Sequence, residues 1–251
     1  MTDERVTIQP FCEMARKTKR RAVAFQVIGE RSSGTNYVHK LLRNSLTLHR
    51  ETYLGWKHGF PQVAHIRDDF LVVCVVRNAA NWILSTHRKP WHTTPAMQRM
   101  GFAEFIRAPW ESEIGKAGYF NPDKVKRIAG LPLQLDRHPI TGAPFANALN
   151  LRNLKLAALL GMPNRAPQCA VVQFEHVLAN PTGFVRQLKQ EFEIGGPEGY
   201  EVGEQKLGAK FHASVDDRPS TPTVIGDRDY KFIRRHLDLE QEKAIGYVYR
   251  A

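Results

Sequence analysis

The stretch that most constrains the fold runs over residues 23–42, where an apolar segment, a short polar loop and a helical pattern follow one another. The apolar segment stops at Gly29, the loop covers residues 30–34, and apolar residues recur at helical spacing from Tyr37 onward. This order predicts a strand, a tight loop and a helix. The loop then lies at a helix N-terminus, where unpaired backbone N–H groups and the positive end of the helix dipole favour an anion such as phosphate.

The loop nearly matches the Walker A pattern that binds nucleotide phosphates. Gly29 and Gly34 are separated by four residues, as in that pattern. Thr35 and Asn36 follow, where the pattern requires lysine and then Ser or Thr. Since that lysine contacts the β- and γ-phosphates and that hydroxyl binds Mg²⁺, the loop suits a phosphorylated ligand without a metal. In this interpretation the two glycines let the chain approach the ligand without a Cβ in the way.

Length and composition favour one cytoplasmic domain with an anionic ligand. The 251 residues, 42% of them hydrophobic, are typical of one α/β domain over 1–251, and the net charge of +11 raises the local concentration of anions. Three cysteines without metal-ligand spacing indicate free thiols in a reducing compartment. The N-terminus has no apolar leader and no run is long enough to span a membrane, so we expect a cytoplasmic protein.

A second strand and helix follow the first pair. Residues 70–76 form a continuous β-branched run of the kind buried on both faces of a parallel sheet, and residues 79–88 have a helical pattern. Two such units predict a single three-layer α/β domain with a central, mostly parallel sheet, whose ligand crevice collects the carboxyl ends of the strands. Further along we expect helices over 147–160, 181–192 and 229–247, a strand over 169–174, a loop over 195–208 and an extended segment over 211–227.

The middle region, residues 89–146, is rich in proline and has little clean periodicity. It predicts a loop-rich insertion with short helices, and loops on a rigid sheet often bind the variable substrate. We therefore expect the acceptor site there. Candidate lining residues are Trp91, His92, Arg99, Trp110 and Arg137.

Arg77 ends the second predicted strand, and Ser85 follows eight residues later on the predicted helix. A guanidinium and a hydroxyl at this spacing can bind one phosphate. Together with the loop, this pair resembles the two nucleotide-binding signatures of the sulfotransferase family, which uses 3'-phosphoadenosine 5'-phosphosulfate (PAPS) as donor. The resemblance rests on ERSSGTNYVHKLL, WKHGFP and VVCVVRNAANWILSTHR, which occur in the family's order, and it extends over about 22–88 and 147–192.

The resemblance implies a P-loop-like fold, PAPS as donor, adenosine 3',5'-bisphosphate as product and no metal. It assigns the 5'-phosphosulfate to the loop, adenine stacking to Tyr37 and the 3'-phosphate to Arg77 and Ser85. The basic residue that the family places directly before Ser-Gly-Thr is Ser32 here, with Arg31 one position earlier. The donor-binding residues implied in this way are Arg31, Ser32, Ser33, Gly34, Thr35, Asn36, Tyr37, Arg77 and Ser85.

His58 is the candidate general base for sulfuryl transfer to a hydroxyl or amine. Imidazole has an ordinary pKa of about 6.5, close to working pH, and the segment around His58 resembles the family's lysine-then-histidine segment. Either Lys57 or Arg31 can stabilise the charge that develops in the transition state. We therefore expect His58, Lys57 and Arg31 to be the catalytic residues.

The acceptor is expected to be a small molecule or a carbohydrate, without specific nucleic-acid binding. Two alternatives share the loop and the charge. A P-loop nucleotide or small-molecule kinase would need the missing lysine and an Asp at the end of the 70–76 strand to order Mg²⁺. A non-enzymatic basic protein that binds nucleic acid or anionic glycan would bind DNA or heparin with a steep salt dependence.

Overall fold

The structure is a computed structural model, and it describes residues 3–115, 120, 125–197 and 211–251. The chain forms two compact units, here called unit 1 (residues 1–7, 78–154 and 210–251) and unit 2 (residues 8–77 and 155–209). The expectation of a single domain over 1–251 stays a prediction. No helix within the described ranges is both long and apolar enough to cross a membrane.

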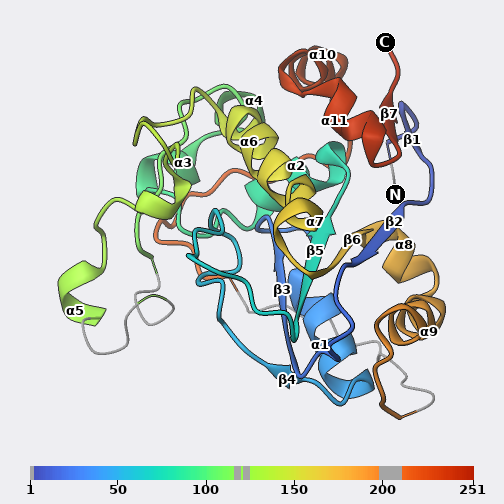
Figure 1. Ribbon diagram of the computed structural model, residues 1–251. Coiled ribbons are helices and arrows are strands. Elements are labelled where there is room, and N and C mark those ends of the chain that lie inside the picture. The colour runs from blue at the N-terminus through green and yellow to red at the C-terminus, as the bar shows by residue number, and fades with distance from the viewer. Residues whose placement is uncertain (1–2, 116–119, 121–124, 198–210) are drawn as a thin grey trace. The chain divides into compact units, whose positions relative to one another are not determined.

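Unit 2 is built on a five-stranded sheet in the order β2-β6-β5-β3-β4 (Figure 1). The pairs β3–β4, β3–β5 and β5–β6 are parallel, and only β2 runs antiparallel, against β6. This confirms a mixed α/β fold with a mostly parallel sheet flanked by helices. The strands are β2 (Cys12–Arg16), β3 (Ala24–Gly29), β4 (His49–Arg50), β5 (Phe70–Val76) and β6 (Gln168–Gln173).

The three central strands are mostly apolar, as expected for strands that are covered on both faces of the sheet. Every residue of β3, β5 and β6 is buried. Phe25, Val73 and Val172 pack on one face in a single cluster with residues of two helices, α1 (Thr35–Ser45) and α9 (Pro181–Phe192). This core fixes the strand ends from which the candidate site is built.

Capping residues in the sequence set where helix α9 of unit 2 begins. Asn180 caps α9 by accepting a hydrogen bond from the Gly183 N–H, and Pro181 occupies the first turn, where its missing N–H costs nothing. Two shorter helices, α7 (Met162–Arg165) and α8 (Phe174–Ala179), flank β6. The expected strand 169–174 therefore ends one residue early, because Phe174 begins α8.

Unit 1 contains the loop-rich insertion that the sequence predicts, with short helices inside it. Its elements are β1 (Val6–Ile8), α2 (Ala79–Arg88), α3 (Pro95–Arg99), α4 (Phe102–Phe105), α5 (Val125–Ile128), the 3-10 helix η3 (Gln134–Asp136), α10 (Asp227–His236), α11 (Leu239–Ala244) and β7 (Tyr247–Tyr249). A further helix, α6 (Ala148–Leu160), begins in unit 1 and continues into unit 2 at Lys155. Residues 116–119 and 121–124 of the insertion, and most of the expected loop 195–208, lie outside the described residues.

The expectation of one closing helix over 229–247 is wrong. That segment forms α10, α11 and β7. Asp238 accepts a hydrogen bond from the Gln241 N–H and so starts a new helix, and Gly246 adopts φ 81°, which ends helical geometry before β7. The segment 211–226 contains no helix or strand, as expected.

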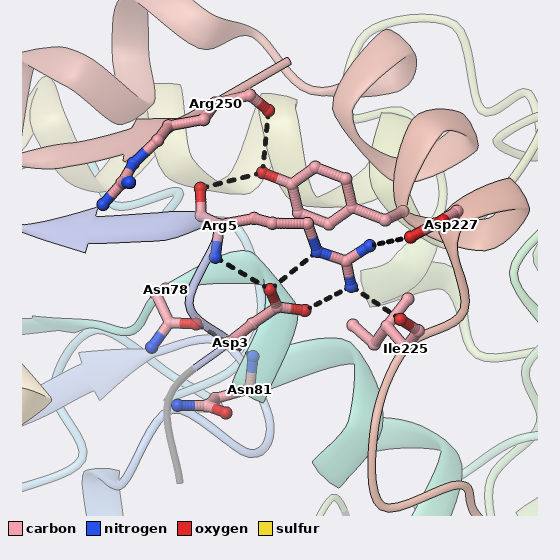
Figure 2. A network of polar contacts seen from close by, with 8 residues as sticks. Asp3, Arg5, Asn78, Asn81, Ile225, Asp227 and Arg250 are labelled. Carbon is pink, nitrogen blue, oxygen red and sulfur yellow. Dashed lines mark hydrogen bonds and ion pairs between the residues drawn. The ribbon is translucent and has the colours of Figure 1, made fainter.

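The N-terminal segment of the chain is tied to α10 within unit 1 by polar contacts around Arg5 (Figure 2). The Arg5 guanidinium binds Asp3 (2.7 Å) and Asp227 (2.8 Å), donates to the Ile225 carbonyl (2.6 Å) and lies 4.0 Å from the centroid of the Tyr230 ring. Strand β1 pairs with β7 beside these contacts. The sequence analysis did not predict β1 or β2, because each is short and defined by its partner strand.

Buried polar groups join α6, α11 and the start of α2 in unit 1. Arg152 and Glu242 form an ion pair of 2.8 Å with both side chains buried. The Tyr249 hydroxyl donates to Glu242 (3.1 Å) and accepts from the Ala79 N–H (2.7 Å). One of the first N–H groups of α2 therefore already has a protein acceptor.

Candidate functional site

The site is built at the carboxyl end of β3, where the chain passes through residues 30–34, called here the glycine loop. The Ser33 N–H (3.3 Å) and hydroxyl (2.7 Å) both donate to the Glu30 carbonyl and close a turn. Ser32 and Gly34 adopt positive φ angles of 65° and 90°, and α1 begins directly afterwards at Thr35. The strand, loop and helix that the sequence predicts over 23–42 are confirmed.

The glycine loop and the start of α1 present backbone donors to the surroundings. Among the residues that the structure describes, the N–H groups of Ser32, Gly34, Thr35 and Asn36 donate to no protein acceptor. These donors lie at the positive end of the α1 dipole, which is the arrangement that binds phosphate and sulfate groups.

The N-terminus of α2 differs from that of α1. Asn78 accepts from the Asn81 N–H at 2.9 Å, and the Tyr249 hydroxyl accepts from Ala79. The protein itself thus satisfies donors at the start of α2. The comparison favours α1 as the helix that receives an anion.

The structure gives a different reason for the two glycines from the one predicted. A Cβ at Gly29 would lie 2.4 Å from the Val75 carbonyl oxygen on the neighbouring strand. A Cβ at Gly34 would lie 2.2 Å from the Phe174 ring. Both glycines are therefore required by packing within unit 2, and Gly34 also by its positive φ.

Two arginines lie at the glycine loop: Arg31 belongs to it, and Arg77 follows the end of β5. The Arg77 guanidinium donates to the Ser32 carbonyl at 2.9 Å and lies 5.6 Å from the centroid of the Phe174 ring. Arg31 is buried, with its guanidinium 5.6 Å from the Trp56 ring. The expected meeting of Arg77 with the loop therefore occurs, because β5 ends next to β3 in the parallel sheet.

The segment that carries Lys57 and His58 is hydrogen-bonded to the tip of β3. The Gly29 N–H donates to the Lys57 carbonyl at 2.9 Å, and His58 Nδ1 lies 2.7 Å from the Gly29 carbonyl oxygen. The Lys57 ammonium donates to the side-chain oxygen of Asn36, the second residue of α1. The predicted base and cation thus lie within one hydrogen bond of the strand tip and the loop helix.

His58 is held as a neutral imidazole. Because Nδ1 faces a carbonyl oxygen, it carries the ring proton and Nε2 keeps its lone pair. Burial lowers the pKa of His58 well below its ordinary value, and the positive charge of Lys57 lowers it further, while the bond to Gly29 acts in the opposite direction. A neutral ring has the protonation state that a general base requires.

Lys57 is suited to supply positive charge. Burial and the nearby Arg50 lower its pKa to about 8. The ammonium form still predominates at neutral pH. It therefore provides a cation next to the first turn of α1.

The remaining predicted donor-binding residues are Tyr37 and Ser85. Tyr37 lies on α1, its ring edge-on to Phe174 with centroids 5.8 Å apart, and burial raises the pKa of its hydroxyl. Adenine stacking by Tyr37 stays a prediction. Ser85 lies on α2 in unit 1, so its predicted pairing with Arg77 of unit 2 also stays a prediction.

Sequence reasoning missed Lys155 and Phe174. Lys155, on α6, donates to the His58 carbonyl, and Phe174 packs against the glycine loop. Two signals were present in the sequence: a lysine inside the apolar helical stretch ALNLRNLKLAALL, and an aromatic residue directly after a buried strand. Two insertion residues have internal partners, since Trp110 donates to Asp136 at 3.2 Å and His92 accepts from the Gly115 N–H at 3.2 Å.

No protein-family model matches this chain, and neither does any curated protein. Within the described parts of the chain, no group of three or more His, Cys, Asp or Glu side chains is placed to hold a metal ion.

Proposed function

We propose that the protein is a sulfotransferase with a P-loop-like fold that moves a sulfuryl group from PAPS to a hydroxyl or amine of a small-molecule or carbohydrate acceptor. The observation that carries the proposal is the pairing, at the tip of β3, of unsatisfied loop N–H groups with a neutral imidazole. The donors suit the anionic end of the PAPS molecule. The imidazole suits removal of the acceptor's proton.

The residues around the glycine loop fit such a donor. The N–H groups of Ser32, Gly34, Thr35 and Asn36 would bind oxygens of the phosphosulfate, and Ser33 keeps the loop closed through Glu30. Arg77 brings a guanidinium to the loop, where it donates to the Ser32 carbonyl, and Arg31 adds positive charge within the loop. Tyr37 and Ser85 would complete the nucleotide site at adenine and at the 3'-phosphate.

The reaction needs a base on the acceptor side and cations on the leaving-group side. His58 takes the acceptor's proton on Nε2 while its Nδ1–H stays on Gly29. The acceptor oxygen or nitrogen forms a bond to sulfur as the bond from sulfur to the bridging phosphate oxygen breaks, and the electron pair leaves with the bisphosphate. Lys57 and Arg31 stabilise the negative charge that develops on that oxygen.

Binding of adenosine 3',5'-bisphosphate tests the proposal against a kinase and against a general polyanion binder. We expect this nucleotide to raise the melting temperature in the presence of EDTA, and ATP with Mg²⁺ to raise it much less. A larger shift with ATP and Mg²⁺ would favour the kinase. If neither nucleotide shifts the melting temperature while heparin binds, the donor assignment is wrong.

Turnover tests the base. We expect His58→Ala to lower turnover of PAPS by about a hundredfold or more while bisphosphate binding stays close to wild type. His65→Ala, at an exposed histidine of the same unit, is the matched control and should leave turnover unchanged. Normal turnover in His58→Ala would remove His58 from the mechanism.

The cellular location belongs to the proposal as well. All three cysteines are free thiols, and Cys74 and Cys169 are buried in β5 and β6. Free thiols and a soluble nucleotide donor fit the cytoplasm.

A further inference from the structure

Helix α6 brings a lysine to the segment that carries His58. The Lys155 side chain is buried, with 5% of the residue exposed, and its ammonium donates to the His58 carbonyl at 2.7 Å. The same ammonium lies 5.7 Å from the ring centroid of Trp56 and 5.5 Å from that of Phe60. Lys155 therefore contacts the segment 56–60 at Trp56, His58 and Phe60.

A buried lysine at position 155 costs more free energy than an apolar residue of similar size would. Burying an ammonium costs free energy that hydrogen bonds and aromatic faces only partly return. Methionine has nearly the same length and no desolvation cost, so packing alone does not require lysine here. The charge and the donated hydrogen bond are what distinguish lysine from an apolar residue at position 155.

The contacts of Lys155 and of the His58 imidazole meet at Trp56. The His58 ring packs edge-on against Trp56, with centroids 5.3 Å apart and an interplanar angle of 85°. The Arg31 guanidinium lies 5.6 Å from the same Trp56 ring. Displacement of the segment 56–60 would therefore move the imidazole and change the contact between Trp56 and Arg31.

We propose that Lys155 is a positioning residue for sulfuryl transfer: its ammonium holds the segment 56–60 so that the His58 imidazole stays on the Gly29 carbonyl with Nε2 unprotonated. The inference rests on the proposed function for its catalytic consequence. Its structural part, the control of the His58 ring, can be measured without any substrate.

The charges that face His58 decide what removal of Lys155 does. Lys57 adjoins it in sequence, Arg31 comes from the glycine loop and Lys155 from α6, and each of these positive charges lowers the pKa of His58. Removal of the Lys155 charge should raise that pKa. The lysine therefore acts on both the place and the protonation state of the imidazole.

The test compares Lys155→Met, Lys155→Gln and Lys155→Arg in the full chain. Methionine removes charge and donor, glutamine removes only the charge, and arginine keeps both. Lys17→Met is the matched control, because the Lys17 ammonium also donates to a backbone carbonyl of unit 2, that of Pro163 at 2.5 Å. The readouts are the NMR titration and tautomer of the His58 ring, assigned with His58→Ala, then bisphosphate affinity and the pH dependence of PAPS turnover.

We expect Lys155→Met to raise the pKa of His58, lower kcat by about ten- to a hundredfold and shift the acid limb of the kcat profile to higher pH. Bisphosphate affinity should stay near wild type. Lys155→Arg should keep the wild-type titration and most of kcat, and Lys17→Met should match wild type. Lys155→Gln should reproduce the raised pKa, which keeps the test decisive if the methionine variant does not fold.

An unchanged His58 titration and tautomer in Lys155→Met, or in Lys155→Gln if only that variant folds, would overturn the inference. The inference would also be overturned if Lys155→Met and Lys155→Arg lost the same amount of kcat and if that loss matched the loss of folded protein in each variant. A wild-type chain that neither binds the bisphosphate nor turns over PAPS would instead contradict the proposed function. The NMR titration would then still decide whether Lys155 controls the imidazole.

Discussion

At the scale of single residues, Phe174 connects most of the parts that surround the glycine loop. Its ring meets the position of a Gly34 Cβ, packs edge-on against Tyr37 and lies under the Arg77 guanidinium. The first residue of α8 therefore forms a wall of the loop. A ring in this place fixes the loop against β6 without using any of the backbone donors.

Gly34→Ala tests this packing. Alanine must adopt a φ of 90° at that position and also place its Cβ 2.2 Å from the Phe174 ring. We expect a loss in the free energy of unfolding of about 1–2 kcal/mol from the backbone and about 1–3 kcal/mol from overpacking. Urea unfolding measures the loss.

Gly55→Ala is the matched control for this variant. Gly55 has a similar φ of 76°, but no atom lies within 4 Å of the added Cβ, so only the backbone cost applies. Phe174→Ala should relieve the overpacking part of Gly34→Ala in the double variant. Equal losses in Gly34→Ala and Gly55→Ala would show that the Phe174 ring moves away without cost.

At the scale of elements, Arg5 joins the N-terminal segment to α10 in Figure 2, and Asp3 binds the same guanidinium. The hydrogen bond from Arg5 lowers the pKa of Asp3 below its ordinary value of 3.8. The folded state therefore keeps Asp3 ionised at a pH where the unfolded chain binds a proton. The contribution of Asp3 to stability is complete above pH 3.8 and is lost as the pH falls through the folded-state pKa.

Asp3→Asn should accordingly reduce the free energy of unfolding at pH 7, and the difference from wild type should vanish in strong acid. Urea unfolding from pH 7 down to about pH 2 measures it. Asp227→Asn is the control, because that side chain is 88% exposed and its ion pair with Arg5 contributes little. A difference that stays constant with pH would mean that the Asp3 charge does not stabilise the contacts around Arg5.

The elements that the sequence predicted well are those whose pattern is local. Buried strands β3 and β5 and helices α2 and α9 follow from apolar runs, helical spacing and nearby capping residues. Strand β2 was missed because its pairing with β6 joins Cys12 to Val172, a contact that no local pattern encodes. The closing helix was wrong because the cap at Asp238 overrides a periodicity that otherwise continues.

The residues of the candidate site also differ in whether a local sequence pattern predicts them. Arg77 was predicted because it follows the 70–76 strand, and the parallel register brings β5 beside β3. His58 and Lys57 were predicted from the resemblance of the segment around them to a sulfotransferase segment, and in the structure that segment is hydrogen-bonded to Gly29. Lys155 and Phe174 come from segments about a hundred residues further along the chain. Their place at the site depends on tertiary packing, which the spacing of residues in the sequence does not contain.

At the scale of the whole molecule, the net charge of +11 attracts anions toward the protein. Charges that lie away from the candidate site contribute to this attraction. Exposed charges such as Lys19 and Arg20 precede β3, at the end of the strand opposite the glycine loop. The Debye length is about 30 Å at 0.01 M salt and about 8 Å at 0.15 M. Distant charges can therefore steer a nucleotide at low salt and not at physiological salt.

Lys19→Gln combined with Arg20→Gln should separate steering from contact. We expect this variant to slow association of adenosine 3',5'-bisphosphate at low salt, to match wild type at 0.15 M salt, and to leave the dissociation rate unchanged, because both residues precede β3, at the end opposite the glycine loop. Arg77→Ala should do the reverse and mainly speed dissociation, since the proposed function gives Arg77 a direct contact with the nucleotide. Stopped-flow binding over a salt series gives both rates. If association is as fast as wild type at low salt, Lys19 and Arg20 have no role in attracting the nucleotide.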